Sequence, residues 1–245
     1  MMLGTLLNAG AILLGAMVGC TTKLGVPPRR QQQIKVLLGV ATAFFGLKLM
    51  WTGLASGTAR FFWYQFVIIL IAMMTGHFIG KLCRLQALMN HLGQTAKVKL
   101  ERAAQGGRDA AGDGFLAAAL LFCAAPLGIV GALEDGLSRY FQPLAIKAVM
   151  DGLAALSFAR MFGWTAMLSA VPVAAFLSGV ALLGERLEPL LSQHGVLGVV
   201  HASAGLLITC VALIIFELKK VEIGNYLPAL IVAPALMKLS ETVLG

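Results

Sequence analysis

The chain has 245 residues, of which 59% are hydrophobic and 12% are charged, and its formal net charge is +8. Soluble domains carry about 25% charged residues, so a soluble fold of this length could not bury so much apolar surface, and we expect the bilayer to solvate most of it. The basic residues lie mainly in the connections between apolar runs, which is typical of a membrane protein and argues against nucleic-acid binding.

Eight apolar runs come close to the length of about 20 residues that a helix needs to cross a bilayer. They cover residues 3–20, 34–54, 61–81, 115–134, 143–162, 164–183, 195–216 and 223–240. None shows the alternation of polar and apolar residues that membrane barrels require. The pattern predicts an all-α, polytopic helical membrane protein with about eight transmembrane helices. Pro228 and Pro234 interrupt the last run, which either spans fully or re-enters.

Orientation follows from the basic residues. Most Lys and Arg side chains fall in the connections after the first, third, fifth and seventh runs. The positive-inside rule places those connections in the cytoplasm and the N-terminus outside.

The only long connection divides the chain into three predicted parts. Residues 1–82 would form the first three transmembrane helices, residues 83–114 a cytoplasmic segment, and residues 115–245 five further transmembrane helices. Within the connection, Leu85, Leu88, Met89 and Leu92 recur at helical spacing, which predicts an amphipathic helix. A Gly-rich linker would follow it, through Gly106, Gly107 and Gly112.

Four charged residues occupy or end apolar runs. Glu134 and Asp135 end the fourth run, whereas Lys147 and Asp151 lie inside the fifth. An ionised side chain in the bilayer costs about 2.5–3.5 kcal/mol on insertion scales, and it often marks an ion or solute path. Lys147 and Asp151 are one helical turn apart on the same face, so they predict either a coupled ion site or a structural ion pair. Asp151 is expected near the midplane.

Glu134 and Asp135 are expected at the outer mouth of such a path, unless the fourth run is broken. Pro126, Gly128 and Gly131 make a break plausible, and a broken helix would expose backbone carbonyls and helix ends to a substrate.

Three uncharged residues complete the candidate substrate- or ion-binding set. Asn8 and His201 are expected at a depth similar to that of the charged group, and Asn225 opens the last run. Each also has a structural interpretation. Asn8 could form a hydrogen bond between helices, His201 could be a packing residue, and Asn225 could belong to an ordinary turn.

Other motifs are weak or missing. The four cysteines form no CxxC pair, so no metal or redox spacing is present. The sequence contains no P-loop, HExxH or GxSxG motif, and we expect neither an enzyme nor a cofactor. Gly15 with Gly19, and Gly76 with Gly80, fit the small-xxx-small pattern, which indicates close helix packing inside the chain or in a homo-oligomer.

Three blocks resemble a known family. Residues 121–136, 147–152 and 223–234, with the opening residues 4–8, are similar to those of the YqgA/YdfK-like family of bacterial inner-membrane proteins. That family has a domain of unknown function and is loosely labelled as transporters. The resemblance spans most of the chain and implies a multi-pass location in the bacterial inner membrane. It implies no substrate.

Together these observations predict a secondary transporter, coupled to protons or sodium, that carries a small polar solute or inorganic ion. A passive channel and a non-transporting membrane scaffold or sensor are the alternatives. The expected partners are the solute or ion and the lipid bilayer, without nucleic acid.

Overall fold

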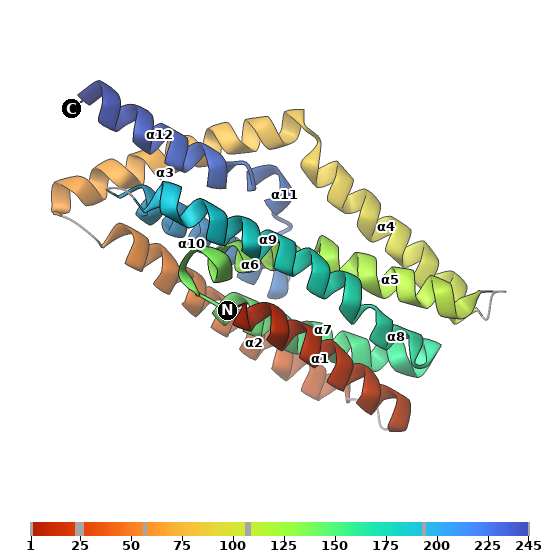
Figure 1. Ribbon diagram of the computed structural model, residues 1–245. Coiled ribbons are helices and arrows are strands. Elements are labelled where there is room, and N and C mark those ends of the chain that lie inside the picture. Colours follow the sequence, from red (N-terminus) through yellow and green to blue (C-terminus); the bar gives the residue numbers. More distant parts are fainter. Residues whose placement is uncertain (1, 23–26, 56–57, 106–108, 193–194, 245) are drawn as a thin grey trace. The chain divides into compact units, whose positions relative to one another are not determined.

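A computed structural model describes residues 2–22, 27–55, 58–105, 109–192 and 195–244 of the chain (Figure 1). Every regular element in these segments is an α-helix, as the long uninterrupted apolar runs predict. A helix satisfies its backbone hydrogen bonds internally, which makes it suitable for a lipid environment.

The helices of the first half cover the first four predicted runs, but α2 begins earlier than its run and the fourth run is divided between α5 and α6. They are α1 (Leu3–Thr21), α2 (Pro28–Leu54), α3 (Ala59–Leu82), α4 (Leu85–Ala104), α5 (Ala110–Ala124) and α6 (Pro126–Ser138). The amphipathic helix expected after the third run is α4. Of the expected linker, Gly106 and Gly107 lie outside the described residues, and Gly112 belongs to the first turn of α5.

The second half contains α7 (Gln142–Phe162), α8 (Thr165–Leu168), α9 (Ala170–Leu191), α10 (Val196–Ile215), α11 (Ile223–Tyr226) and α12 (Ala229–Leu244). The last predicted run is interrupted as expected, because α11 ends before Pro228 and α12 begins after it.

By length and hydropathy, six helical segments in the described chain could cross a membrane. They are Leu3–Thr21, Arg29–Leu54, Arg60–Leu82, Thr165–Leu191, Val196–Ile215 and Ile223–Ser240, and the bent pair α5–α6 would make a seventh. Two further long helices do not meet these criteria: the amphipathic α4, and α7, which carries Lys147 and Asp151. The all-helical, multi-pass class is therefore confirmed, whereas the total of eight spans and the orientation of the N-terminus stay predictions.

Contacts divide the chain into two compact units. The first comprises Met1–Lys35 and Leu88–Leu183, and the second Val36–Ala87 and Gly184–Gly245. Each unit combines segments that are far apart in the sequence.

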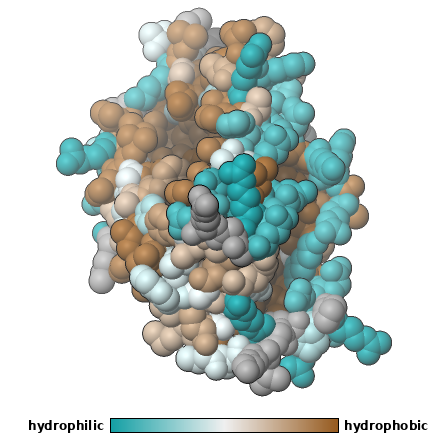
Figure 2. Space-filling view, turned by 90° about the vertical axis from the view of Figure 1, so that its right-hand side faces the viewer, coloured by the Kyte–Doolittle hydropathy of each residue, from teal (hydrophilic) through white to brown (hydrophobic). Residues whose placement is uncertain are grey.

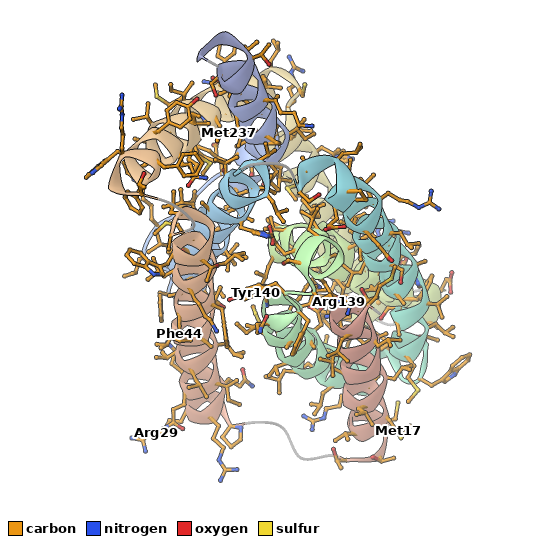
Figure 3. The ribbon with its side chains drawn as sticks, turned by 60° about the vertical axis from the view of Figure 1, so that its left-hand side comes forward. Met17, Arg29, Phe44, Arg139, Tyr140 and Met237 are labelled. Atoms are coloured by element: carbon orange, nitrogen blue, oxygen red, sulfur yellow. The ribbon has the colours of Figure 1, made fainter. Side chains whose placement is uncertain are left out.

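In the first unit, α1 packs along α7 (Figure 1). Small and aliphatic residues form the core around this pair, among them Ile12 and Ala16 of α1, Ala155 and Ala159 of α7, and Leu177 of α9. In the second unit, α3 packs against α11 and α12, and α10 packs against α12. Its core includes Ile69, Val199 and Met237, the last of which is labelled in Figure 3.

Large apolar side chains also cover much of the surface. Leu37 and Phe44 of α2, Trp63 of α3 and Val171 of α9 are each at least 60% exposed. Figure 2 shows such hydrophobic surface in brown, and Figure 3 labels Phe44. A water-soluble monomer rarely exposes apolar patches of this extent, but lipid chains solvate them at no cost.

Candidate functional site

Lys147 and Asp151 form a buried ion pair on α7. The ammonium of Lys147 donates a hydrogen bond to Oδ2 of Asp151, and the two residues are only 2% and 7% exposed. This pair confirms the prediction that both side chains share one helical face. Each charge stabilises the other, because an ionised side chain buried without an opposite charge is strongly unfavourable.

Asn8 joins this pair from α1. Its side-chain amide donates from Nδ2 to Oδ2 of Asp151 over 2.8 Å, and Asn8 is fully buried. The hydrogen bond is possible because α1 and α7 lie unusually close together. A side chain at Gly15 of α1 would collide with the backbone carbonyl of Gly152, the residue that follows Asp151.

Asp135 binds the beginning of α1. Its Oδ2 accepts a hydrogen bond of 2.9 Å from the backbone N–H of Gly4, in the first turn of that helix. The first N–H groups of a helix lack partners within the helix and carry partial positive charge, so a carboxylate is favourable there. Asp135 is 3% exposed, and its neighbour Glu134 is fully buried. The protein itself therefore covers both carboxylates, which agrees with the exception made for a broken fourth run.

The fourth apolar run is broken, as its proline and glycines made plausible. The axes of α5 and α6 differ by 59° at the break. Ala125 has an extended conformation between the two helices, with φ of −70° and ψ of 121°, and Pro126 begins α6. Proline disfavours helical geometry in the preceding residue and suits the first position of a helix, so one residue explains both the end of α5 and the start of α6.

Lys147 lies along this break. A side chain at Gly128 would come within 2.7 Å of Cε of Lys147, so the absence of one leaves room for the lysine stem. Nζ of Lys147 lies 6.0 Å from the ring centroid of Phe122, near the end of α5. An aromatic face attracts a cation at this range. Sequence reasoning missed Phe122 and Gly128 as neighbours of Lys147, because nothing in their local spacing relates them to α7.

Several buried oxygen atoms in this region have no hydrogen-bond partner among the described residues. They include Oγ1 of Thr5, Oδ1 of Asn8 and Oδ1 of Asp135. Leaving a buried acceptor unsatisfied costs about 1–3 kcal/mol. Thr5 was not predicted as a site residue, and its spacing of three residues from Asn8 was the only available signal.

The remaining two candidates belong to the second unit. Asn225 is 4% exposed, accepts from the backbone N–H of Gln86 over 3.2 Å, and donates to Oε2 of Glu222 over 2.8 Å. The N–H of Gly224 donates in turn to Oε1 of Gln86 over 2.9 Å. These bonds give Asn225 a structural role in holding α11 against the start of α4. His201 is half-buried on α10.

Other potential binding features are limited. Within the described segments, no group of three or more His, Cys, Asp or Glu residues is arranged to hold a metal ion. A cavity of about 320 Å³ follows one side of α4 and is lined by His91, Gln94, Thr95, Val98, Lys99 and Arg102. None of the predicted site residues lines it. Between α6 and α7, burial and the nearby Glu134 raise the pKa of Tyr140 to about 12, so this phenol stays neutral at physiological pH.

The comparisons with known proteins agree on one family. A family model described as "Protein of unknown function (DUF554)" matches residues 3–238. The "Uncharacterized membrane protein YdfK" of Bacillus subtilis (strain 168) is 22% identical over 237 residues, which cover 96% of each chain. The "Uncharacterized protein YqgA" of Escherichia coli (strain K12) is 26% identical over 238 residues, or 95% of each chain. No solved structure matches the chain. The resemblance seen in the three sequence blocks is thus confirmed.

Proposed function

We propose that this chain, which belongs to the DUF554 family of proteins of unknown function, is a secondary transporter that couples a proton or sodium gradient to the movement of a small polar solute or ion. It would act in the inner membrane of a bacterium, without a cofactor and without enzymatic chemistry. Its partners would be the transported species and the lipid bilayer.

The observation that carries the proposal is the buried group of Lys147, Asp151 and Asn8 beside the break between α5 and α6. Ionisable residues are rare inside membrane spans, where they often mark ion or solute paths. Broken helices are a recurring feature of transporter binding sites, because their ends offer unpaired backbone groups and partial charges to an ion. Finding both features together within one unit favours transport.

The buried ion pair and three of the other candidate residues would have different roles in transport. Asp151 and Lys147 form the coupling centre, in which binding or loss of a cation changes the attraction between them. Glu134 and Asp135 supply negative charge to the same unit. Because Asn225 is engaged with Gln86 and Glu222, we assign it a supporting role in the second unit.

A non-transporting scaffold or sensor is the second candidate. The ion pair between Lys147 and Asp151 favours this candidate, because its only role could be to let both charged side chains be buried. A passive channel has no comparable observation in its favour.

The test is transport in proteoliposomes that contain the purified chain. A panel of small polar solutes and inorganic ions is added outside, while dyes inside report proton or sodium flux. We expect at least one solute to drive ion flux, and Asp151→Asn to abolish that flux. Asp113→Asn is the matched control, because Asp113 also pairs with a lysine, Lys99, but lies in the first turn of α5.

Two outcomes would refute transport by this site. One is solute-coupled flux that Asp151→Asn leaves unchanged in rate and pH dependence, at equal reconstitution. The other is the absence of flux for every solute together with a marked loss of stability in Asp151→Asn, which would favour the scaffold, in which the ion pair has only a structural role.

A further inference from the structure

We infer that the first unit binds a sodium ion between the first turns of α1 and the last turn of α6, through Oγ1 of Thr5, Oδ1 of Asn8 and Oδ1 of Asp135. This inference rests on the proposed function and deepens it by naming the coupling ion. It also assigns Thr5, which was not among the predicted site residues, to the site.

The three oxygen atoms belong to residues that the fold brings together. Asp135 is held at the beginning of α1, because its other carboxylate oxygen accepts from the N–H of Gly4 over 2.9 Å. Thr5 follows Gly4 directly, and Asn8 lies three residues further on, so both side chains share one face of the helix. The hydrogen bond from Nδ2 of Asn8 to Asp151 fixes the orientation of the Asn8 amide. It therefore also fixes the position of Oδ1.

All three oxygens are buried acceptors that the protein leaves unsatisfied. Thr5, Asn8 and Asp135 are 2%, 0% and 3% exposed. In the part of the chain that the structure describes, none of these oxygens has a hydrogen-bond partner. Buried polar groups in native proteins almost always have a hydrogen-bond partner or a bound ion. A hydrogen-bond donor or a cation is therefore expected beside these three oxygens.

The chemistry of the three oxygen ligands indicates which ion would bind. A hydroxyl, an amide carbonyl and a carboxylate are hard oxygen ligands, which suit alkali and alkaline-earth cations rather than transition metals. Only one of the three is a carboxylate, which suits a monovalent cation better than a divalent one. Among the described residues, no group of three or more His, Cys, Asp or Glu side chains is arranged to hold a metal ion.

The first test measures binding without transport. The thermal midpoint of the purified full chain in detergent is recorded while NaCl replaces choline chloride at constant ionic strength. A ligand that binds the folded state raises the midpoint in a saturable way. We expect such a rise with Na⁺, and half-saturation at a higher concentration with K⁺. A midpoint that does not depend on Na⁺ would overturn the inference and leave water as the occupant of the site.

Two variants locate the ion. Asp135→Asn removes the single charged ligand, and Thr5→Val removes a hydroxyl while keeping the shape of the side chain. We expect each to raise the half-saturating Na⁺ concentration, by about tenfold or more for Asp135→Asn. Thr42→Val is the matched control, because Thr42 is also fully buried but its hydroxyl donates to the carbonyl of Leu38 in α2.

An unchanged Na⁺ response in both variants would overturn the site even if the wild-type chain binds Na⁺. If Asp135→Asn fails to fold, the Thr5→Val result decides. Failure of this inference is separate from failure of the proposed function: transport that is coupled to protons and abolished by Asp151→Asn would stand without any effect of Na⁺ on stability.

Discussion

At the scale of single residues, the stability of the first unit depends on keeping two buried charges together. Lys147 is 2% exposed and has the carboxylate of Asp151 as its counter-charge. Removing one partner leaves the other charge buried and uncompensated. We expect Lys147→Met to lower the free energy of unfolding by about 3–5 kcal/mol, measured by denaturation of the purified protein in detergent.

The control for this prediction removes both charges. Lys147→Met combined with Asp151→Leu should recover most of the lost stability, because an apolar pair of similar volume needs no counter-charge. Lys48→Met changes an exposed lysine of α2 and should have little effect. A double variant no more stable than Lys147→Met alone would show that the pair is not what stabilises this part of α7.

A second residue-scale prediction concerns Asn225. The structure engages its side chain with the backbone of Gln86, whose own side chain binds the N–H of Gly224. Residues joined in this way are energetically coupled. We expect a double-mutant cycle of Gln86→Ala and Asn225→Ala to give a coupling energy of about 0.5–3 kcal/mol in thermal or chemical unfolding.

Additive effects of these two substitutions would contradict the structural role. Asn225 would then be better explained as a binding residue. Met74→Ala on α3 serves as the comparison for Asn225→Ala, since Met74 is 75% exposed and takes no part in these bonds.

At the scale of elements, the close approach of α1 and α7 is what places Asn8 on Asp151. A methyl group at Gly15 would meet the carbonyl of Gly152 on the facing helix, whereas one at Gly10 would meet nothing within 4 Å. We therefore expect Gly15→Ala to destabilise the protein by about 1–3 kcal/mol through overpacking. Gly10→Ala should be neutral or stabilising by up to about 1 kcal/mol, because alanine favours a helix.

Thermal unfolding of these two variants checks the prediction directly. Equal midpoints for both would mean that α1 and α7 are not in close contact. The same collisions occur at Gly19 against Leu156, and at Gly76 and Gly80 against Ala229 and Asn225. The small-xxx-small pattern therefore serves packing within the chain, and whether it also supports a homo-oligomer stays a prediction.

The positions of proline and glycine predict the break between α5 and α6, but they do not predict which side chain lies beside it. Pro126 identifies where a helix is difficult to continue, because proline restricts Ala125 and cannot donate a backbone hydrogen bond. The bend of 59°, and the position of Lys147 over Gly128, depend on α7, which packs against α6. A local pattern contains no information about that partner.

At the scale of the whole molecule, the orientation in the membrane is the prediction that most needs a direct test. The distribution of basic residues places the connection after α6 outside and the connection after α4 in the cytoplasm. Ser138 and Gln105 are exposed residues at these two places. In a variant without native cysteines, Ser138→Cys should react with a membrane-impermeant maleimide in intact cells.

Gln105→Cys should react only after the cells are permeabilised. Labelling of Gln105→Cys alone in intact cells would show that the protein has the opposite orientation. Labelling of both on the same side would mean that the α5–α6 pair re-enters rather than spans.

Sequence by itself determined the class and most of the helices. Uninterrupted apolar runs predict helices because only a helix satisfies its own backbone in lipid, so α1, α3, α7 and α10 begin and end within two residues of the predicted runs. Helical spacing also determined that Lys147 and Asp151 would meet, since residues four apart share a face.

Only the tertiary structure decided which residues of α1 bind Asp151 and Asp135. Asn8 and Asp151 are 143 residues apart in the sequence, and Gly4 and Asp135 are 131 apart. It also decided that Glu134 and Asp135 are buried, and that Asn225 belongs to a different unit. The physical reason is that helical periodicity fixes which side chains share one helix face, whereas contact between helices depends on packing of small residues across the whole interface.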